Sequence, residues 1–402
     1  QEAEMSIINK RKQYCIVFSV TVIAVIIYLF SHRVHMIQPI AIEMDKAVDN
    51  FIQLATVTEE WNMQGNVLSA CEYNIQNIIM LLLIKICGNV WTGINIYYIF
   101  TFFMISFSMY YFLRKLEISA QISIGLAVLA AFMPFHIDRG EGQMITSNFF
   151  LAPLFMSMFY DMIYCRKLII NKGYMILVCL APFIDIRISV MACIILCFLL
   201  IQRKDQELTR VALRFFLPFL LLCGFVCIFA STLKIADIQT AKQEGMRILD
   251  LVMPMRYHAI GRLSDIRLNY DITLSAHGES GLNSLGILFS FGFVCMMIGM
   301  FFEWKKDRRI AWMGMICIFV FLIAGICGLG SVLDYFGLHV IYWSRMAVFF
   351  VVCSIATIGI FIGNIYNNIG QKYGKRIQQI NCMFIYMMFI LEFFALIIRR
   401  NM

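Results

Sequence analysis

Short clusters of lysine and arginine separate long apolar stretches throughout this chain, and this alternation restricts its fold more than any other feature. Six clusters recur: Lys10-Arg11-Lys12, Arg114-Lys115, Arg166-Lys167 with Lys172, Arg203-Lys204 through Arg210, Lys305-Lys306 with Arg308-Arg309, and Lys372-Gly374-Lys375-Arg376. Most acidic residues and histidines lie in the alternate gaps. Because cytoplasmic loops of membrane proteins are enriched in lysine and arginine, the clusters predict six cytoplasmic faces. The gaps between them are expected to face outward and to carry any chemistry.

The composition agrees with a membrane protein, because 61% of the residues are hydrophobic, only 14% are charged and the mean hydropathy is +0.79. Such values lie outside the range of soluble domains. The net charge of +8 does not indicate a nucleic-acid partner, since the basic residues form clusters at span ends, where an anionic leaflet attracts them. Nearly all of the 14 cysteines lie in apolar runs, which is typical of small buried apolar side chains. No CxxC pair and no Cys/His cluster with zinc spacing occurs, so no metal or other cofactor is expected.

The apolar runs predict an all-α protein, a single polytopic bundle of about 11 transmembrane helices over 1–402. Crossing a hydrocarbon core of about 30 Å takes roughly 20 helical residues. The first run, at 15–30, is expected to be a retained span because no small-residue cleavage site follows it. The predicted spans are 14–31, 91–112, 119–135, 146–164, 173–184, 188–202, 210–231, 284–302, 310–328, 345–366 and 381–398.

This path places the N-terminus and every basic cluster on the cytoplasmic side of the cell membrane. It leaves two large extracytoplasmic loops, 32–90 and 232–283. The first loop contains an amphipathic stripe over 42–55, which suits a helix lying on the membrane surface. The run 78–87 is too short to cross and carries Lys85, so it is expected to lie at the outer interface as well.

One predicted pair of crossings is unusually short, because only 30 residues separate Lys172 from Arg203. Two passes of about 15 residues each reach roughly 22 Å. Asp185 and Arg187 at the tip would then lie below the outer membrane surface. Charged backbone at that depth is tolerated where it lines protein or water, so the hairpin indicates an outward-facing cavity. The alternative is an Asp–Arg pair that merely locks the hairpin.

The first outward loop begins with acidic residues that include Asp45 and Asp49. A carboxylate just above a membrane cavity can take a proton from an acceptor hydroxyl if it lies within hydrogen-bond reach. The alternative is that these side chains form a solvated surface, as most acidic loop residues do.

The second outward loop packs His136, Asp138, Arg139, Glu141 and Gln143 between two spans, although a turn needs none of them. Arginine offers a planar donor fork to a phosphate, and histidine a proton that it can share or retain. His136 and Arg139 are therefore candidates for binding an anionic phosphate. The alternative is an ion-paired lid over the bundle.

The large loop 232–283 adds His258 and Arg262, which would share one face of a helix, and Glu279 beside His277. The alternative is that this loop forms a folded cap and that these residues have no role in substrate binding. Arg345 follows Tyr342 and Trp343 at the expected outer mouth of a span. It is either an interface anchor or a contact for a lipid phosphate.

Together these features resemble the GT-C superfamily of multi-pass glycosyltransferases that use polyprenyl-phosphate-linked sugars, and within it bacterial sugar transferases of the cell envelope. The resemblance covers nearly the entire chain. It is carried by the long first loop with an early acidic residue (Asp45), Pro134-Phe135-His136 with Arg139, Pro254 with His258 and Arg262, and Gly325 to Gly330 followed by Arg345.

The chain departs from the family pattern at three points. The family's acidic residue usually follows glycine, whereas Asp45 follows Met44, so Asp49 remains an alternative. The second loop often carries a further histidine where this chain has Gln143. Members commonly continue into an outer domain after the last span, whereas this sequence ends at Met402.

The resemblance implies an enzyme, a membrane glycosyltransferase active in polysaccharide biosynthesis. A polyprenyl-phosphate-linked sugar would be the donor and an envelope glycan or lipid the acceptor. The donor phosphate would be held by some of His136, Arg139, His258, Arg262 and Arg345, with Gln143 and Glu279 as further substrate contacts. Asp45 or Asp49 would act as general base, which implies inversion at the anomeric carbon, and no metal would be required.

Two other functions compete with this interpretation. An O-antigen or polysaccharide polymerase has similar size and large outer loops, and its Arg-x10-Gly pattern is met by Arg267 and Gly278, although 24 glycines make one such match expected by accident. A non-enzymatic lipid or polysaccharide transporter would show charged residues in the middle of several spans and broken helices in two related halves. Neither feature is visible in the sequence.

Overall fold

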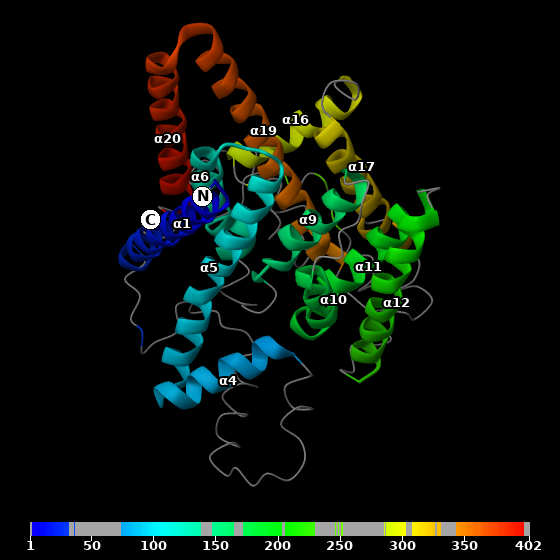
Figure 1. Ribbon diagram of the computed structural model, residues 1–402. Helices are drawn as coiled ribbons and strands as arrows, with labels where there is room; N and C mark the ends of the chain where they lie inside the picture. The colour runs from blue at the N-terminus through cyan, green and yellow to red at the C-terminus, as the bar shows by residue number, and fades with distance from the viewer. Residues whose placement is uncertain are drawn as a thin grey trace, which may run out of the picture.

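A computed structural model of the chain defines the fold (Figure 1). It describes residues 2–31, 36, 74–137, 147–164, 172–202, 206–229, 246, 248, 251, 285, 287–302, 308–325, 328–330 and 343–397. Over these residues the protein is all-helical, with one isolated β-bridge between Met246 and Gly325. This confirms the predicted all-α class, whereas the number of spans stays a prediction.

Each predicted apolar segment contains a helix. The helices are α1 (Glu2–Ser31), α4 (Ile75–Cys87), α5 (Val90–Lys115), α6 (Ala120–Ala131), α9 (Leu151–Tyr164), α10 (Lys172–Ile184), α11 (Ile186–Gln202), α12 (Gln206–Phe229), α16 (Ile287–Phe302), α17 (Arg308–Ala324), the 3₁₀ helix η4 (Trp343–Ala347), α19 (Val348–Tyr373) and α20 (Lys375–Ile397).

Five stretches within the described residues are helical, long and apolar enough to cross a membrane: Arg11–Ser31, Val90–Lys115, Ala120–Ile137, Arg345–Ile369 and Ile377–Phe394. Several shorter apolar helices accompany them. Large apolar side chains are exposed on peripheral helices, for example Phe30 (80% exposed), Leu221 (65%) and Met383 (73%). Such surfaces are unfavourable in water but not in lipid. The chain is therefore a membrane protein.

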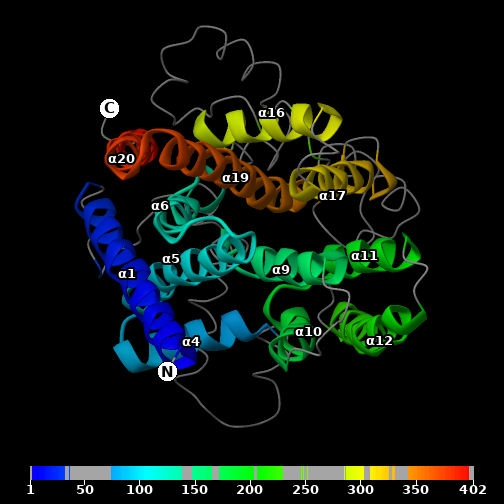
Figure 2. The ribbon, with the colours of Figure 1, turned by 45° about the horizontal axis from the view of Figure 1, so that its top comes forward.

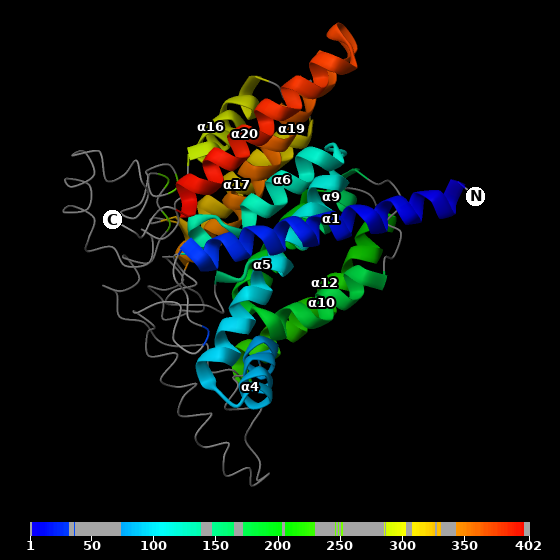
Figure 3. The same cartoon turned by 90° about the vertical axis from the view of Figure 1, so that its left-hand side faces the viewer.

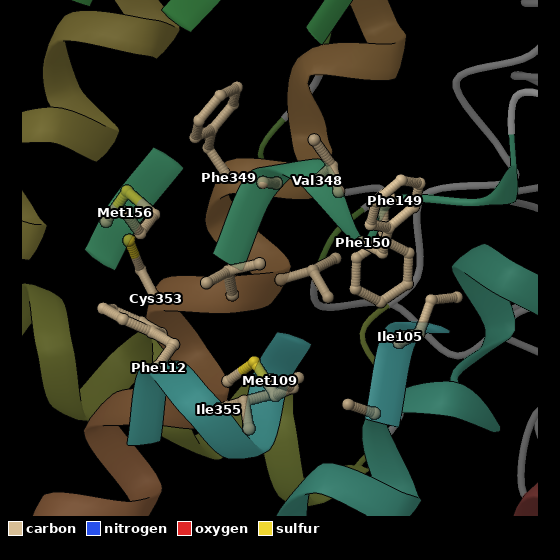
Figure 4. Close-up of a cluster of buried hydrophobic side chains, with 14 of the residues drawn as sticks. Ile105, Met109, Phe112, Phe149, Phe150, Met156, Val348, Phe349, Cys353 and Ile355 are labelled. Atoms are coloured by element: carbon tan, nitrogen blue, oxygen red, sulfur yellow. The ribbon is translucent and has the colours of Figure 1, made fainter. Parts of the chain in front are cut away.

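The helices are arranged in layers. Figure 2 shows α5, α9 and α11 as a central row, with α17 and α19 on one side and α4, α10 and α12 on the other. Facing side chains fill the space between them, as in the cluster of Ile105, Met109 and Phe112 from α5 with Phe349 and Cys353 from α19 (Figure 4). All five are fully buried. In a membrane, close packing of this kind is a main force that holds helices together.

Helix α4, which was predicted as an interfacial helix, lies crosswise at the start of α5, near Val90 (Figures 1 and 3). It ends at Cys87, and the C-cap residue Gly88 has a φ of 64°, the left-handed conformation that turns the chain away from the helix. Asn89 then caps α5, accepting a hydrogen bond from the Thr92 backbone N–H at 3.0 Å. A Cβ at Gly93 would lie 2.5 Å from the Ile84 backbone, so the two helices touch through their main chains.

Candidate functional site

Of the residues predicted to form the site, the structure describes His136 and Arg345. The others, Asp45, Asp49, Arg139, Gln143, His258, Arg262 and Glu279, lie outside the described residues. Their roles stay predictions.

His136 lies in the short helical stretch that follows α6, and its ring is fully buried. Its Nδ1 donates to the Ala131 carbonyl oxygen at 2.6 Å, because a carbonyl only accepts. Its Nε2 lies 2.8 Å from Thr101 Oγ1 on α5. The rings of Tyr98 and Phe102 pack against it, with centroids 5.3 and 4.4 Å away. Both nitrogens are thus engaged inside the protein, and His136 joins α5 to α6 in this arrangement. A direct phosphate contact would require the ring to leave this position.

The short hairpin predicted from the sequence is present as α10 and α11, with Asp185 between them. Asp185 is only 4% exposed. Its Oδ1 accepts hydrogen bonds from the backbone N–H groups of Arg187 at 2.9 Å and Ile188 at 3.3 Å. This is an N-cap, which satisfies two of the donors left open at the start of a helix. The carboxylate therefore fixes the start of α11 and the place of Arg187 on it.

A small cavity of about 10 Å³ lies at this turn. It is lined by Phe135, which precedes His136, by Asp185, Arg187 and Ile188 of the hairpin, and by Arg345, Met346 and Val348. Arg345 belongs to η4, directly before α19. The volume is about that needed to hold one water molecule. Three segments that are far apart in the sequence meet here.

The charged residues that line this cavity are two arginines, Arg187 and Arg345, and one aspartate, Asp185. Guanidinium groups form charge-assisted hydrogen bonds with phosphate or carboxylate oxygens in a planar fork. Arg345 was predicted from the sequence as a site residue, whereas Asp185 and Arg187 were predicted to lie at the tip of a hairpin beside a cavity and were not named as site residues. The signal was present, because the hairpin was too short to bring these charges to the membrane surface.

A buried polar network supports the hairpin from the side of α4. Gln76 of α4 donates from Nε2 to the Ile184 carbonyl oxygen at 2.8 Å, one residue before Asp185. Its Oε1 accepts hydrogen bonds from the Tyr97 hydroxyl of α5 and from Asn148 Nδ2, the latter at 2.9 Å. All three side chains are at most 2% exposed. Because buried polar groups are costly unless they are paired, this network fixes α4 against the hairpin.

Nothing in the described part of the chain gathers three or more metal-ligating His, Cys, Asp or Glu side chains. The cysteines described there are free thiols, several of them buried in the core. No protein-family model, curated protein or solved structure matches this chain. Arg187 and Arg345, which line one small cavity, are the described residues that bear most directly on function.

Proposed function

We propose that this chain is a GT-C-type membrane glycosyltransferase of about 11 spans. It transfers a sugar from a polyprenyl-phosphate donor to an envelope glycan or lipid acceptor on the outer face of the cytoplasmic membrane. The observation that carries the proposal is the convergence of Arg187 and Arg345 on one cavity, beside Phe135 of the second outward loop.

The position of this cavity along the helices supports an outward location. Asp185 lies at the end of α10 and α11 that is remote from Lys172 and from Arg203-Lys204. Arg345 precedes α19, whose other end reaches Lys372. The cavity thus lies at the helix ends opposite the basic clusters, which the positive-inside rule assigns to the cytoplasm.

The proposed chemistry follows from these charges. In sugar transfer from a polyprenyl phosphate, the bond between the anomeric carbon and the phosphate oxygen breaks, and negative charge develops on the leaving phosphate. Arg187 and Arg345 stabilise that charge once the cavity, which has room for one water molecule in this structure, has widened to admit the phosphate. Asp45 or Asp49 takes the proton of the acceptor hydroxyl, which attacks from the opposite face and inverts the configuration.

The deciding experiment is a mass-spectrometric comparison of envelope glycans from cells with and without the gene. Loss of one hexose on deletion, restored by the wild-type gene, is the expected result. Arg345→Ala and Arg187→Ala should fail to restore it, whereas Arg11→Ala, at an exposed position of α1, should succeed. Unchanged glycans after deletion, or full restoration by both cavity variants, would overturn the proposal. Loss of whole repeating chains instead would favour a polymerase or a transporter.

A vesicle assay separates the roles of the two charge types. With vesicles loaded with a polyprenyl-phosphate hexose, Arg345→Ala should slow transfer about 100-fold or more, the usual effect of removing one preorganised donor. Arg345→Lys should recover part of the rate, because the charge remains but the fork is lost.

Asp45→Asn should abolish transfer at normal expression if Asp45 is the base. If only Asp49→Asn does so, the base is Asp49, and if neither does, the general-base step is wrong.

A further inference from the structure

A second pocket, distinct from the arginine cavity, lies between α9, α11 and α17, which are neighbours in Figure 2. Its volume is about 150 Å³. Met162 and Ile163 of α9, Phe198 and Leu199 of α11, and three residues of α17 line it, and all of these side chains are apolar or aromatic. A dry apolar cavity of about this size takes up a benzene-sized hydrocarbon.

The two pockets lie toward opposite ends of α11. Arg187 lines the arginine cavity and Phe198 lines the apolar pocket. Eleven residues of helix separate them, or roughly 16 Å along the axis. The apolar pocket is therefore not part of the proposed phosphate site.

One face of α17 changes from cationic to apolar along this pocket. Arg308 is exposed at the start of the helix, Trp312 follows four residues later, and Met315 and Ile316 continue the same face into the pocket. Trp312 is 3% exposed, and its Nε1–H finds no hydrogen-bond acceptor among the residues that the structure describes. A buried indole N–H usually has a partner, so this donor calls for an acceptor that the described protein atoms do not supply.

The helix ends that line this pocket adjoin basic clusters of the sequence. In the sequence, Arg166-Lys167 follow the end of α9, Arg203-Lys204 follow the end of α11, and Arg308 opens α17. Basic residues around a pocket between membrane helices attract anionic lipid head groups. In a bilayer, the hydrocarbon that can fill an apolar pocket at this depth is a lipid chain.

We propose that this pocket binds an anionic phospholipid. Part of one acyl chain occupies the space between α9, α11 and α17. The head group lies at the start of α17, where Arg308 contacts its phosphate, and the Trp312 Nε1–H donates to an ester or phosphate oxygen between the two. The inference is independent of the proposed sugar transfer.

Lipid binding is tested on the full chain in detergent by native mass spectrometry, with phosphatidylglycerol and phosphatidylcholine as probes. The wild type should retain phosphatidylglycerol preferentially. Arg308→Gln should reduce that preference about fivefold, the effect expected from one cation near the surface. Arg11→Gln, a matched change at another exposed arginine, should leave it unchanged. Equal retention of both lipids, or equal effects of the two substitutions, would overturn the proposal.

The position of the chain is tested with lipids brominated in the acyl chain, which quench nearby tryptophan fluorescence. Brominated phosphatidylglycerol should quench the wild type more than brominated phosphatidylcholine, and Trp312→Phe should remove this difference. Ile316→Phe, which fills the pocket, should reduce lipid retention, whereas Leu322→Phe at a lipid-exposed position of the same helix should not. A difference in quenching between the two lipids that persists in Trp312→Phe, or retention of a polyprenyl phosphate in place of phosphatidylglycerol, would contradict the assignment.

Discussion

At the scale of single residues, Asp185 serves the fold and the charge of the arginine cavity together. Its carboxylate accepts the first N–H groups of α11, and the same residue lines the cavity with Arg187 and Arg345. Two substitutions separate these effects, because asparagine keeps the capping oxygen and loses the charge, whereas alanine loses both.

We predict that Asp185→Asn leaves the free energy of unfolding within a few tenths of a kcal/mol of the wild-type value, since asparagine is as good an N-cap as aspartate. Asp185→Ala should lower it by about 1 kcal/mol, as expected when a cap is lost. Unfolding in mixed detergent micelles provides the measurement. Equal losses for both variants would show that the charge, rather than the cap, stabilises the hairpin.

His136 illustrates what the sequence cannot reveal about a single residue. Its neighbours Asp138, Arg139 and Glu141 made it look like one member of a polar loop. In the structure its ring is held by Thr101 and by the Ala131 carbonyl oxygen. Thr101 lies 35 residues from His136 in the sequence, and the Ala131 partner is a backbone atom, which every residue has. No local sequence pattern therefore indicates either contact.

At the scale of elements, the close contact between α4 and α5 depends on a glycine, Gly93, which has no side chain. A Cβ at Gly93 would meet the backbone of Ile84 at 2.5 Å, and backbone has little freedom to move away. We predict that Gly93→Ala lowers the free energy of unfolding by about 1–3 kcal/mol, as overpacking does. Gly224→Ala is the matched control, because a Cβ there would meet nothing within 4 Å. A cysteine placed at buried Met80 should become reactive only in the Gly93→Ala background.

Unchanged stability and an unreactive cysteine at Met80 would show that α4 is not fixed by this contact. If the prediction holds, the hydrogen bond from Gln76 to the Ile184 carbonyl oxygen should be lost as well, because both depend on the position of α4.

The elements themselves could be predicted well, because a run of apolar residues long enough to cross lipid has few structures other than a helix. The ends were less predictable. The span expected at 119–135 contains α6, which ends at Ala131 before Pro134, and the helix expected to end at 366 continues to Tyr373. Gly374, with φ of 84°, then provides the turn into α20. Such ends depend on caps and single backbone angles rather than on hydrophobicity.

At the scale of the whole molecule, the candidate site is assembled from segments that no sequence period relates. Arg187 and Arg345 lie on separate helices and meet only because α11 and η4 pack together. The short hairpin indicated a cavity. That η4 with Arg345 lines the other side of this cavity depends on how the bundle packs, which the sequence does not show. The pocket at Trp312 was likewise invisible, since its lining residues look like ordinary parts of three spans.

The topology itself yields the last prediction, because the lysine and arginine clusters assign every loop to one side of the membrane. An epitope tag inserted in the loop 232–283 should bind antibody on right-side-out vesicles, whereas the same tag inserted after Lys305 should bind only after permeabilisation. The two positions flank α16, which contains no charged residue. A tag that is accessible on the same side at both positions would mean that α16 does not cross. Reversed accessibility would place the arginine cavity on the cytoplasmic side, where an outward-facing sugar transfer would be impossible.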